Sequence, residues 1–296
     1  MVITGSPTRL AEKPVCLDVC EIVIDILALD KNDHLNSVKK CALVSQAFLP
    51  LCRKHIFATI KIGDPSWSSE PSHSDTDEGS YHALEDFTQL IKRTPAIGNY
   101  IRCLQFYFME NDLRTMLDDF PRALQQLTIL KSLAIQAAYL EEVFNWRALP
   151  WPVRNALLRL MHLPSLTTLT LGGIENFLVT DLVHGTNLRC LQVIYCTFFE
   201  DSADAPSTPI ILPAKLIRLH ELVIYSNTNS SGIKEITSAR RSDGLPVIDA
   251  AELTSVSVKC LGLGDMHTLR TFLKRSEQLT EFDLTGKTFV SLLEVL

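Results

Sequence analysis

The side chains in this sequence that could do chemistry are its eight cysteines, its eight histidines and its carboxylates. The cysteines form no C-x-x-C pair, and no histidine has a second histidine or a cysteine at the spacing of metal ligands. Glycine loops that hold phosphates, the H-E-x-x-H zinc motif and the G-x-S-x-G nucleophile motif are all absent. Neighbouring acids such as Glu141 and Glu142 fall in helical patterns, where we expect solvated side chains. The sequence therefore predicts a protein that is not an enzyme and needs no metal or cofactor.

The acidic charge of the chain lies mainly in one segment. The formal net charge is −6, and residues 63–86 contain seven acidic residues and no lysine or arginine. The remainder is nearly neutral, which argues against a chain that binds nucleic-acid phosphates. Residues 61–80 are rich in Ser, Pro and Asp and show no periodicity, so we expect an acidic linker or exposed loop there.

The apolar residues favour a globular chain inside the cell. They make up 46% of the sequence, yet no apolar run approaches the roughly 20 residues that span a bilayer. Residues 1–13 lack the apolar stretch of a signal peptide and are predicted to be a flexible tail. Most cysteines lie in apolar runs, where a free thiol behaves as a small buried hydrophobe. We expect an intracellular protein, in the cytoplasm, the nucleus or both, with neither nucleic acid nor membrane as a partner.

A six-residue pattern, L-x-x-L-x-L or a close variant, recurs seven times in the later part of the chain. Its copies begin at Ile101, Leu130, Leu166, Leu188, Leu219, Leu253 and Leu279. They are spaced by 22 to 36 residues, with helical patterns between them. The spacing is typical of leucine-rich repeats, so we expect an α/β leucine-rich-repeat solenoid with irregular repeats over residues 81–296. An ordinary α/β domain with leucine-rich parallel strands is the alternative.

Side chains alternate along a strand, so the leucines face the core and the residues between them face the open, concave side of the sheet. Because repeat proteins use such surfaces for recognition, we expect this face to bind a protein substrate. The candidate substrate-binding residues are Gln105, Tyr107, Gln192, Glu221, Tyr225, Lys259, Glu281 and Asp283. Cys196 falls at the Cys/Asn position of the repeat consensus, where a side chain can satisfy backbone groups in the turn after a strand.

Residues 14–60 are dense in helix signals. Residues 17–29 are apolar around most of the helix circumference, and such a helix must be covered on two sides. Residues 36–49 predict a second helix, and Pro50 is well placed as the first residue of a third. Three short helices cannot enclose so much apolar surface alone, so the pattern indicates a partner.

The stretch CALVSQAFLP at residues 41–50, followed by His55-Ile-Phe57, resembles an F-box, particularly the version found in basidiomycete fungal proteins. Val15 and Cys16 stand where that family has Leu-Pro, and Asp18 stands where it has Glu. The resemblance covers residues 14–60. The repeats extend it to a known domain pairing, in which an F-box precedes leucine-rich repeats.

The resemblance implies a substrate-recognition subunit of an SCF-type (Skp–cullin–F-box) ubiquitin ligase. Such proteins dock through the F-box onto the Skp adaptor, and through it onto a cullin–RING ligase, while their repeats hold the substrate for ubiquitin-dependent degradation. The adaptor-binding residues are then expected among Val15, Leu17, Val19, Ile22, Ile26, Val44 and Phe48. A leucine-rich-repeat scaffold without a ligase role is the second hypothesis, and a hydrolase or transferase on an α/β frame is the third.

Overall fold

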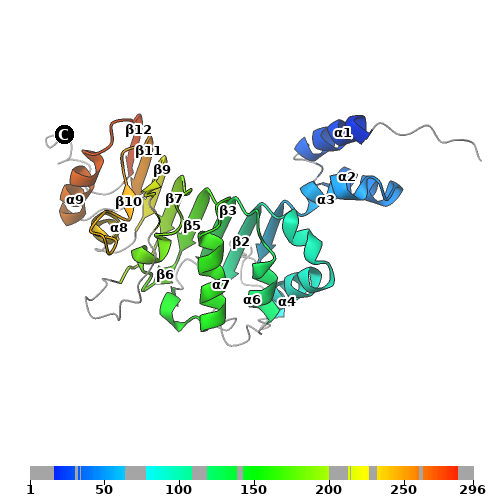
Figure 1. Ribbon diagram of the computed structural model, residues 1–296, viewed down its shortest axis with the longest axis horizontal. Helices are drawn as coiled ribbons and strands as arrows, with labels where there is room; N and C mark the ends of the chain where they lie inside the picture. Colours follow the sequence, from blue (N-terminus) through cyan, green and yellow to red (C-terminus); the bar gives the residue numbers. More distant parts are fainter. Residues whose placement is uncertain are drawn as a thin grey trace, which may run out of the picture. The chain divides into compact units, whose positions relative to one another are not determined.

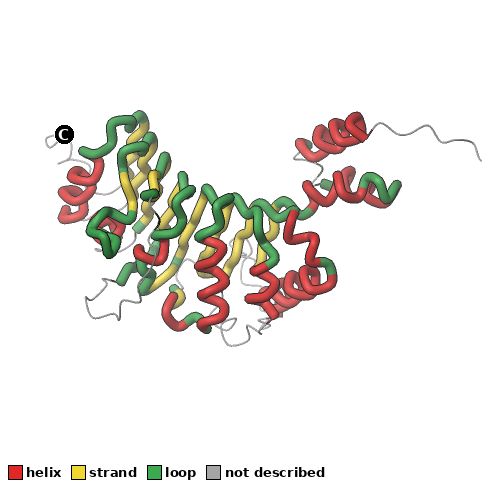
Figure 2. The backbone as a smooth tube through the Cα atoms, viewed as in Figure 1, coloured by secondary structure: helices red, strands yellow, loops and turns green. Residues whose placement is uncertain are grey.

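The computed structural model describes residues 17–30, 33, 35–63, 78–108, 119–138, 143–199, 213, 215–226, 232–259 and 263–285. Contacts between residues divide the chain into two compact units, residues 1–58 and 59–296. Figure 1 labels most helices and strands of both units, and Figure 2 distinguishes helices, strands and loops by colour. None of the described helices has the length and the apolar composition that crossing a membrane requires.

Three helices form the first unit: α1 (Leu17–Leu29), α2 (Asn36–Val44) and α3 (Leu49–Ile56). Ile24, Val38 and Cys52, one from each helix, form its small buried core. The three helices are close to those predicted from the sequence, and Pro50 lies in the first turn of α3, where its missing N–H costs no hydrogen bond.

The second helix is shorter than predicted, because it ends at Val44 rather than at residue 49. Ser45 has extended backbone angles, with φ −152° and ψ 142°. Its hydroxyl oxygen accepts a hydrogen bond from the Ala47 N–H at 3.2 Å. Serine side chains offer the backbone such local bonds in place of helical ones, and here that bond accompanies the end of the helix.

The second unit is built on a parallel sheet of eight strands that follow one another in chain order (Figure 1). The strands are β1 (Thr59–Ile62), β2 (Cys103–Phe108), β3 (Ser132–Ala137), β5 (Thr168–Gly172), β7 (Cys190–Ile194), β9 (Glu221–Tyr225), β11 (Ser255–Lys259) and β12 (Glu281–Thr285). The last four residues of each L-x-x-L-x-L copy lie in one of the strands β2 to β12. The prediction of an α/β fold with a large parallel sheet is confirmed.

Helices connect the strands, and α4, α6 and α7 lie along one side of the sheet (Figures 1 and 2). The described connections contain α4 (Glu78–Arg93), η1 (Pro95–Asn99), α6 (Asp119–Gln125), η2 (Trp146–Ala148), α7 (Trp151–Met161), η3 (Val179–Leu182), α8 (Ile233–Ser238) and α9 (Leu263–Leu273). Short parallel pairs join β4 (Phe144–Asn145) to β6 (Ile174–Glu175), and β8 (Ile217–Arg218) to β10 (Ile248–Asp249). The ring of Phe120 in α6 lies 5.2 Å from that of Phe106 in β2, so this helix packs on the core-facing side of the strand.

Burial alternates along the strands, as the leucine pattern predicts. In β2 and β3 every second residue is buried. Leu104, Leu133 and Leu169 share one register position in neighbouring strands and are fully buried, so they stack in a continuous row. The alternation is interrupted at Gly172 in β5 and at Val223 in β9, which are buried like their neighbours. It is lost in β12, where Phe282 is 38% exposed and Leu284 is half-buried. The core is therefore well covered through β11 and thins at β12.

One hydrogen-bond arrangement, called the edge ladder below, recurs where the strands begin. The carbonyl oxygen of the residue before a strand accepts two backbone N–H groups from the next repeat. At Arg102 these come from Lys131, at 2.7 Å, and Ser132, at 3.0 Å. The same pair of bonds recurs at the carbonyl oxygens of Lys131, Thr167, Arg189, His220 and Thr254. The edge ladder satisfies these backbone groups and aligns the starts of the strands from β2 to β12.

The boundaries of the units differ from the sequence-based ones. The first unit ends at Ala58, whereas the F-box was predicted to reach residue 60. Strand β1 pairs with β2, from Thr59 with Cys103 to Ile62 with Phe106, and so belongs to the sheet. Helix α4 begins at Glu78, inside the linker predicted over residues 61–80. Residues 64–77 of that linker, like the tail at 1–13, lie outside the described residues.

Candidate protein-binding surfaces

Two acidic residues of α1 bind α3. Lys54 Nζ lies 2.6 Å from Glu21 Oε1 and 2.8 Å from Asp25 Oδ1, and His55 Nε2 lies 2.7 Å from Asp25 Oδ1. The hydrogen bond from Lys54, followed by the one with His55, lowers the pKa of Asp25 below its ordinary value. These contacts fix the rotation of α1 about its own axis, because Glu21 and Asp25 face α3 while Ile24 enters the core.

With Glu21 and Asp25 paired to α3 and Ile24 in the core, α1 exposes apolar side chains. Each of them is at least 48% exposed: Leu17, Val19, Ile22, Val23, Ile26 and Leu29. Positions 19, 22, 23 and 26 follow the i, i+3, i+4, i+7 spacing of one helix face, and we call these four residues the outer stripe. An ordinary surface helix turns its apolar stripe inward, whereas α1 turns the outer stripe outward. Exposed apolar patches of this kind mark interaction sites.

Most of the predicted adaptor-binding residues are exposed. These are Leu17, Val19, Ile22, Ile26 and Val44. Phe48 differs, because it is half-buried and packs against the core of the first unit itself. The turn after Val44, closed by a 3.0 Å hydrogen bond from the Phe48 N–H to the Ser45 carbonyl oxygen, brings it there. Val15 lies outside the described residues.

Val23, Leu29 and Leu43 are exposed apolar residues that were not selected from the sequence, and Leu43 is 88% exposed. A helix that is apolar around its whole circumference does not reveal which side faces outward. The signal in the sequence for which side faces inward was the acidic pair Glu21 and Asp25, at i and i+4, which can pair with Lys54 and His55 of the third helix.

The side of the sheet away from the helices, called the open face below, carries three rows of side chains in register. The first row is Thr59, Cys103, Ser132, Thr168, Cys190, Glu221, Ser255 and Glu281. The middle row is Lys61, Gln105, Ala134, Thr170, Gln192, Val223, Ser257 and Asp283. The third row is Tyr107, Gln136, Gly172, Ile194, Tyr225, Lys259 and Thr285.

All eight residues predicted to bind substrate lie in these rows, on strands β2, β7, β9, β11 and β12. Lys259, Glu281 and Asp283 are exposed, and the other five are half-buried among their neighbours. Lys61 in the middle row was missed, because β1 carries no leucine pattern from which its facing residues could be counted. Where the leucine pattern is present, the alternation of side chains along the strand is therefore sufficient to identify the residues of the open face.

Polar contacts on the open face run mostly between neighbouring side chains of the rows. Tyr107 donates a 3.4 Å hydrogen bond to Gln105 Oε1, and Thr170 donates one of 3.3 Å to Gln192 Oε1. Ser255 and Ser257 on β11 donate to the carboxylates of Glu281 and Asp283 on β12, at 3.2 and 3.4 Å. Lys259 Nζ lies 5.8 Å from the centre of the Tyr225 ring, within the range of a cation–π contact.

Burial raises the pKa of two thiols in and after β7, Cys190 and Cys196, which disfavours their nucleophilic thiolate forms. Burial, followed by the nearby Glu221 carboxylate, raises the pKa of the Cys190 thiol to about 12. Burial likewise raises the pKa of Cys196 to about 12, and its Sγ donates a 3.4 Å hydrogen bond to the Ile194 carbonyl oxygen. Cys196, just after β7, thus bonds the backbone carbonyl of the last residue of that strand. Within the described ranges, no group of His, Cys, Asp and Glu side chains is arranged to hold a metal ion.

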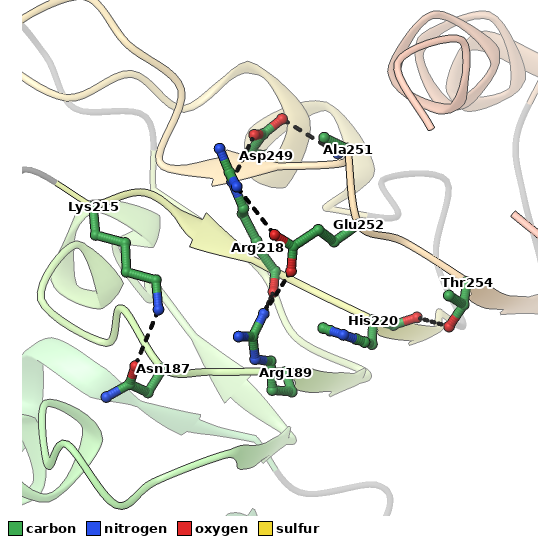
Figure 3. A network of polar contacts seen from close by, with 9 residues as sticks. All are labelled: Asn187, Arg189, Lys215, Arg218, His220, Asp249, Ala251, Glu252 and Thr254. Carbon is green, nitrogen blue, oxygen red and sulfur yellow. Dashed lines mark hydrogen bonds and ion pairs between the residues drawn. The ribbon is translucent and has the colours of Figure 1, made fainter. Parts of the chain in front are cut away.

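Ion pairs tie together the segments that enter β7, β9 and β11 (Figure 3). The Glu252 carboxylate lies between two guanidinium groups, with Arg189 Nη1 2.7 Å from Oε2 and Arg218 Nη1 3.0 Å from Oε1. Arg218 Nε lies 3.4 Å from Asp249 Oδ2. The hydrogen bonds from Arg218 and Arg189 lower the pKa of Glu252, that from Arg218 having the larger effect. These contacts support the strand starts beside the edge ladder.

The two surfaces therefore differ in chemistry: the outer stripe is an apolar helix face, and the open face is a polar sheet face with charged residues at its ends. No protein-family model matches the chain, and no curated protein resembles it to a significant degree.

Proposed function

We propose that this chain is the substrate-recognition subunit of an SCF-type ubiquitin ligase. In this proposal the first unit is an F-box that docks onto the Skp adaptor, and the second unit is a leucine-rich-repeat domain that binds the protein substrate. A separate enzyme of the cullin–RING ligase transfers ubiquitin, which agrees with a chain whose sequence contains no catalytic motif. The likeness of residues 41–57 to an F-box supports the identity of the adaptor.

The outer stripe of α1 is the observation that carries the proposal. Glu21 and Asp25 are engaged by Lys54 and His55, so α1 cannot turn its apolar side inward without breaking these ion pairs. Fully burying a Val, Leu or Ile side chain contributes about 1.5–3 kcal/mol. The four residues of the outer stripe are 48–61% exposed, so a partner that covers them gains about half of this energy from each.

The regular sheet of the second unit supports the substrate-binding role. Strands in chain order, one buried leucine row and the edge ladder are the features expected of stacked leucine-rich repeats. Such a stack presents a long row of polar side chains on its open face, and Tyr107 and Tyr225 are the aromatic residues there. Tyrosine is enriched among residues that dominate binding energies.

The adaptor-docking prediction is tested with a double substitution, Ile22→Asp with Ile26→Asp, in the full-length chain. Carboxylates in an apolar contact remain unpaired and desolvated, so affinity for a purified Skp adaptor should fall by at least about thirtyfold. Leu245→Asp is the matched control, because Leu245 is an exposed apolar residue of the second unit, 48% exposed, and should leave adaptor binding unchanged. Calorimetric titration measures the affinity of each variant for the adaptor. Wild-type affinity in the double variant would exclude docking through the outer stripe.

A repeat scaffold without a ligase role is the second candidate, and Val15-Cys16 in place of Leu-Pro favours it. Under that hypothesis the outer stripe binds some other protein. The same titration separates the two: a wild-type chain that does not bind the Skp adaptor supports the scaffold, and nanomolar to micromolar binding supports the ligase subunit.

A further inference from the structure

The middle row of the open face begins with a cation and ends with an anion. Lys61 on β1 and Asp283 on β12 are its charged members, and the six residues between them are uncharged. Both charged residues are exposed, and neither forms an ion pair within the described part of the chain. Neighbouring strands lie about 4.8 Å apart, so the strands that carry the two charges are separated by about 34 Å along the sheet.

Two amide side chains lie between the charges in this row. Tyr107 and Thr170 donate to the amide oxygens of Gln105 and Gln192. The Gln192 NH₂ group also donates a 3.9 Å hydrogen bond to Cys190 Sγ, and its second N–H, with the NH₂ group of Gln105, can donate to a carbonyl group of a bound chain. The residues between these glutamines in the middle row are the small Ala134 and Thr170. A polypeptide backbone can therefore approach the strands closely there and bond the two amides without a fixed sequence.

The two ends of the open face differ in charge beyond the middle row. Glu221 and Glu281 lie in the first row at the β9–β12 end, on the same face as Asp283. Lys259 is the basic residue of the rows at this end, and it lies against the Tyr225 ring. Three carboxylates against one ammonium group leave this end acidic. At the opposite end, Lys61 is the charged residue that β1 and β2 contribute to the rows.

We propose that the open face binds an extended protein segment of about ten residues, with an acidic residue over β1 and basic residues over β12. The proposal rests on the substrate-binding part of the proposed function and names the class of segment that is recognised. An extended chain rises about 3.4 Å per residue, so ten residues cover about 34 Å, whereas a ten-residue helix covers about 15 Å. Charge complementarity at the two ends determines which end of the segment meets which strand and rejects segments of uniform charge.

Selection of random peptides of about twelve residues, displayed on phage, against the immobilised full-length chain tests the proposal. Enriched peptides should carry Asp or Glu near one end and Lys or Arg about nine positions away. A synthetic peptide chosen from them should bind the K61E/D283K double variant at least about tenfold more weakly, because both contacts become repulsive. The same peptide with its two charged residues exchanged should recover most of the lost affinity.

Lys274→Glu with Glu277→Lys is the matched control, because it reverses the same two charges at exposed positions outside the rows. It should bind the original peptide like the wild type. Thermal melting checks that the variants are folded. If K61E/D283K unfolds, the neutral K61Q/D283N variant replaces it, and its affinity for the peptide should fall by about threefold or more.

Three outcomes would overturn the proposal. No peptides are enriched above a surface that carries no protein, the enriched peptides lack the charge pair, or the double variant binds the peptide with unchanged affinity. Adaptor titration is independent of all these readouts, so failure of docking is distinguished from failure of this inference.

Discussion

At the scale of single residues, polar contacts decide which apolar side chains face a partner. Ile22 and Phe48 both lie in apolar helical patterns, and the sequence predicts both to face the adaptor. Ile22 is exposed, because Glu21 and Asp25 bind Lys54 and turn the other side of α1 outward. Phe48 packs inward, because α2 ends early. Residue type alone could not separate these outcomes, since both depend on contacts between helices.

Half-buried His162, at the end of α7, makes the stability of the second unit depend on pH. Its Nε2 lies 2.6 Å from the Asp181 carbonyl oxygen, and its ring lies 5.1 Å from that of His184, edge to face. Burial first, and then the charge of His184, lower the pKa of His162 below 6.5, against the opposing effect of the hydrogen bond with the Asp181 backbone. The unfolded chain therefore binds this proton more readily than the folded chain, and stability falls as the pH drops from about 6.5 toward the lowered pKa.

We expect His162→Gln to reduce this dependence, because glutamine can still donate to the Asp181 carbonyl oxygen but does not titrate. The decrease in melting temperature from about pH 7.5 to about pH 5.5 should be smaller in the variant than in the wild type. His220→Gln, at an exposed position, is the control and should keep the wild-type decrease. Equal pH dependence in all three proteins would show that His162 does not contribute.

At the scale of elements, the sequence predicts the strands better than their surroundings. The leucine pattern is local and repeats, so β2 to β12 and their facing residues follow from counting. The sequence does not predict β1 as a strand of the sheet. Its four residues become one by pairing with the free edge of β2, a contact that no local pattern reveals. The end of α2 was missed for a similar reason, since a serine side chain and a turn override the apolar periodicity.

The turn after β1 depends on a glycine. Gly63 has φ +73°, and a Cβ atom there would lie 2.5 Å from the Tyr107 carbonyl oxygen. Gly244 has a similar φ of +81°, but a Cβ atom there would meet nothing within 4 Å. Alanine at Gly244 should therefore cost about 1–2 kcal/mol of unfolding free energy from the backbone alone. Alanine at Gly63 should cost more, because β1 must also shift away from β2. Urea unfolding of the two variants measures the difference, and equal losses would contradict it.

At the scale of the whole molecule, the chain consists of two units with one candidate surface each. The fold class and the facing residues of the sheet could be predicted from the sequence, because they follow from periodicity within each element. The exposure of Val23 and Leu29 on α1 and the place of Lys61 at the β1 end of the middle row could not. They depend on ion pairs between helices and on the order of strands in space.

Separate surfaces should give separable functions. Ile22→Asp with Ile26→Asp should abolish adaptor binding and leave the affinity for the selected peptide unchanged. K61E/D283K should do the reverse, weakening the peptide and sparing the adaptor, because its charges lie in another unit. Titration of each variant with both ligands measures this. Loss of both ligands in a variant that melts like the wild type would mean that the two surfaces are coupled.

The edge ladder lets the connections of this chain vary without cost to the sheet. Copies of the pattern that begin at Leu130 and Leu166 are 36 residues apart, and those at Leu166 and Leu188 only 22, yet the carbonyl bonds at the strand starts are the same. Doubling the length of a flexible loop costs only about 0.6 kcal/mol in closure entropy. Insertions and deletions in evolution, or a peptide grafted into a connection by design, can therefore change the rim of the molecule while the rows of the open face keep their alignment.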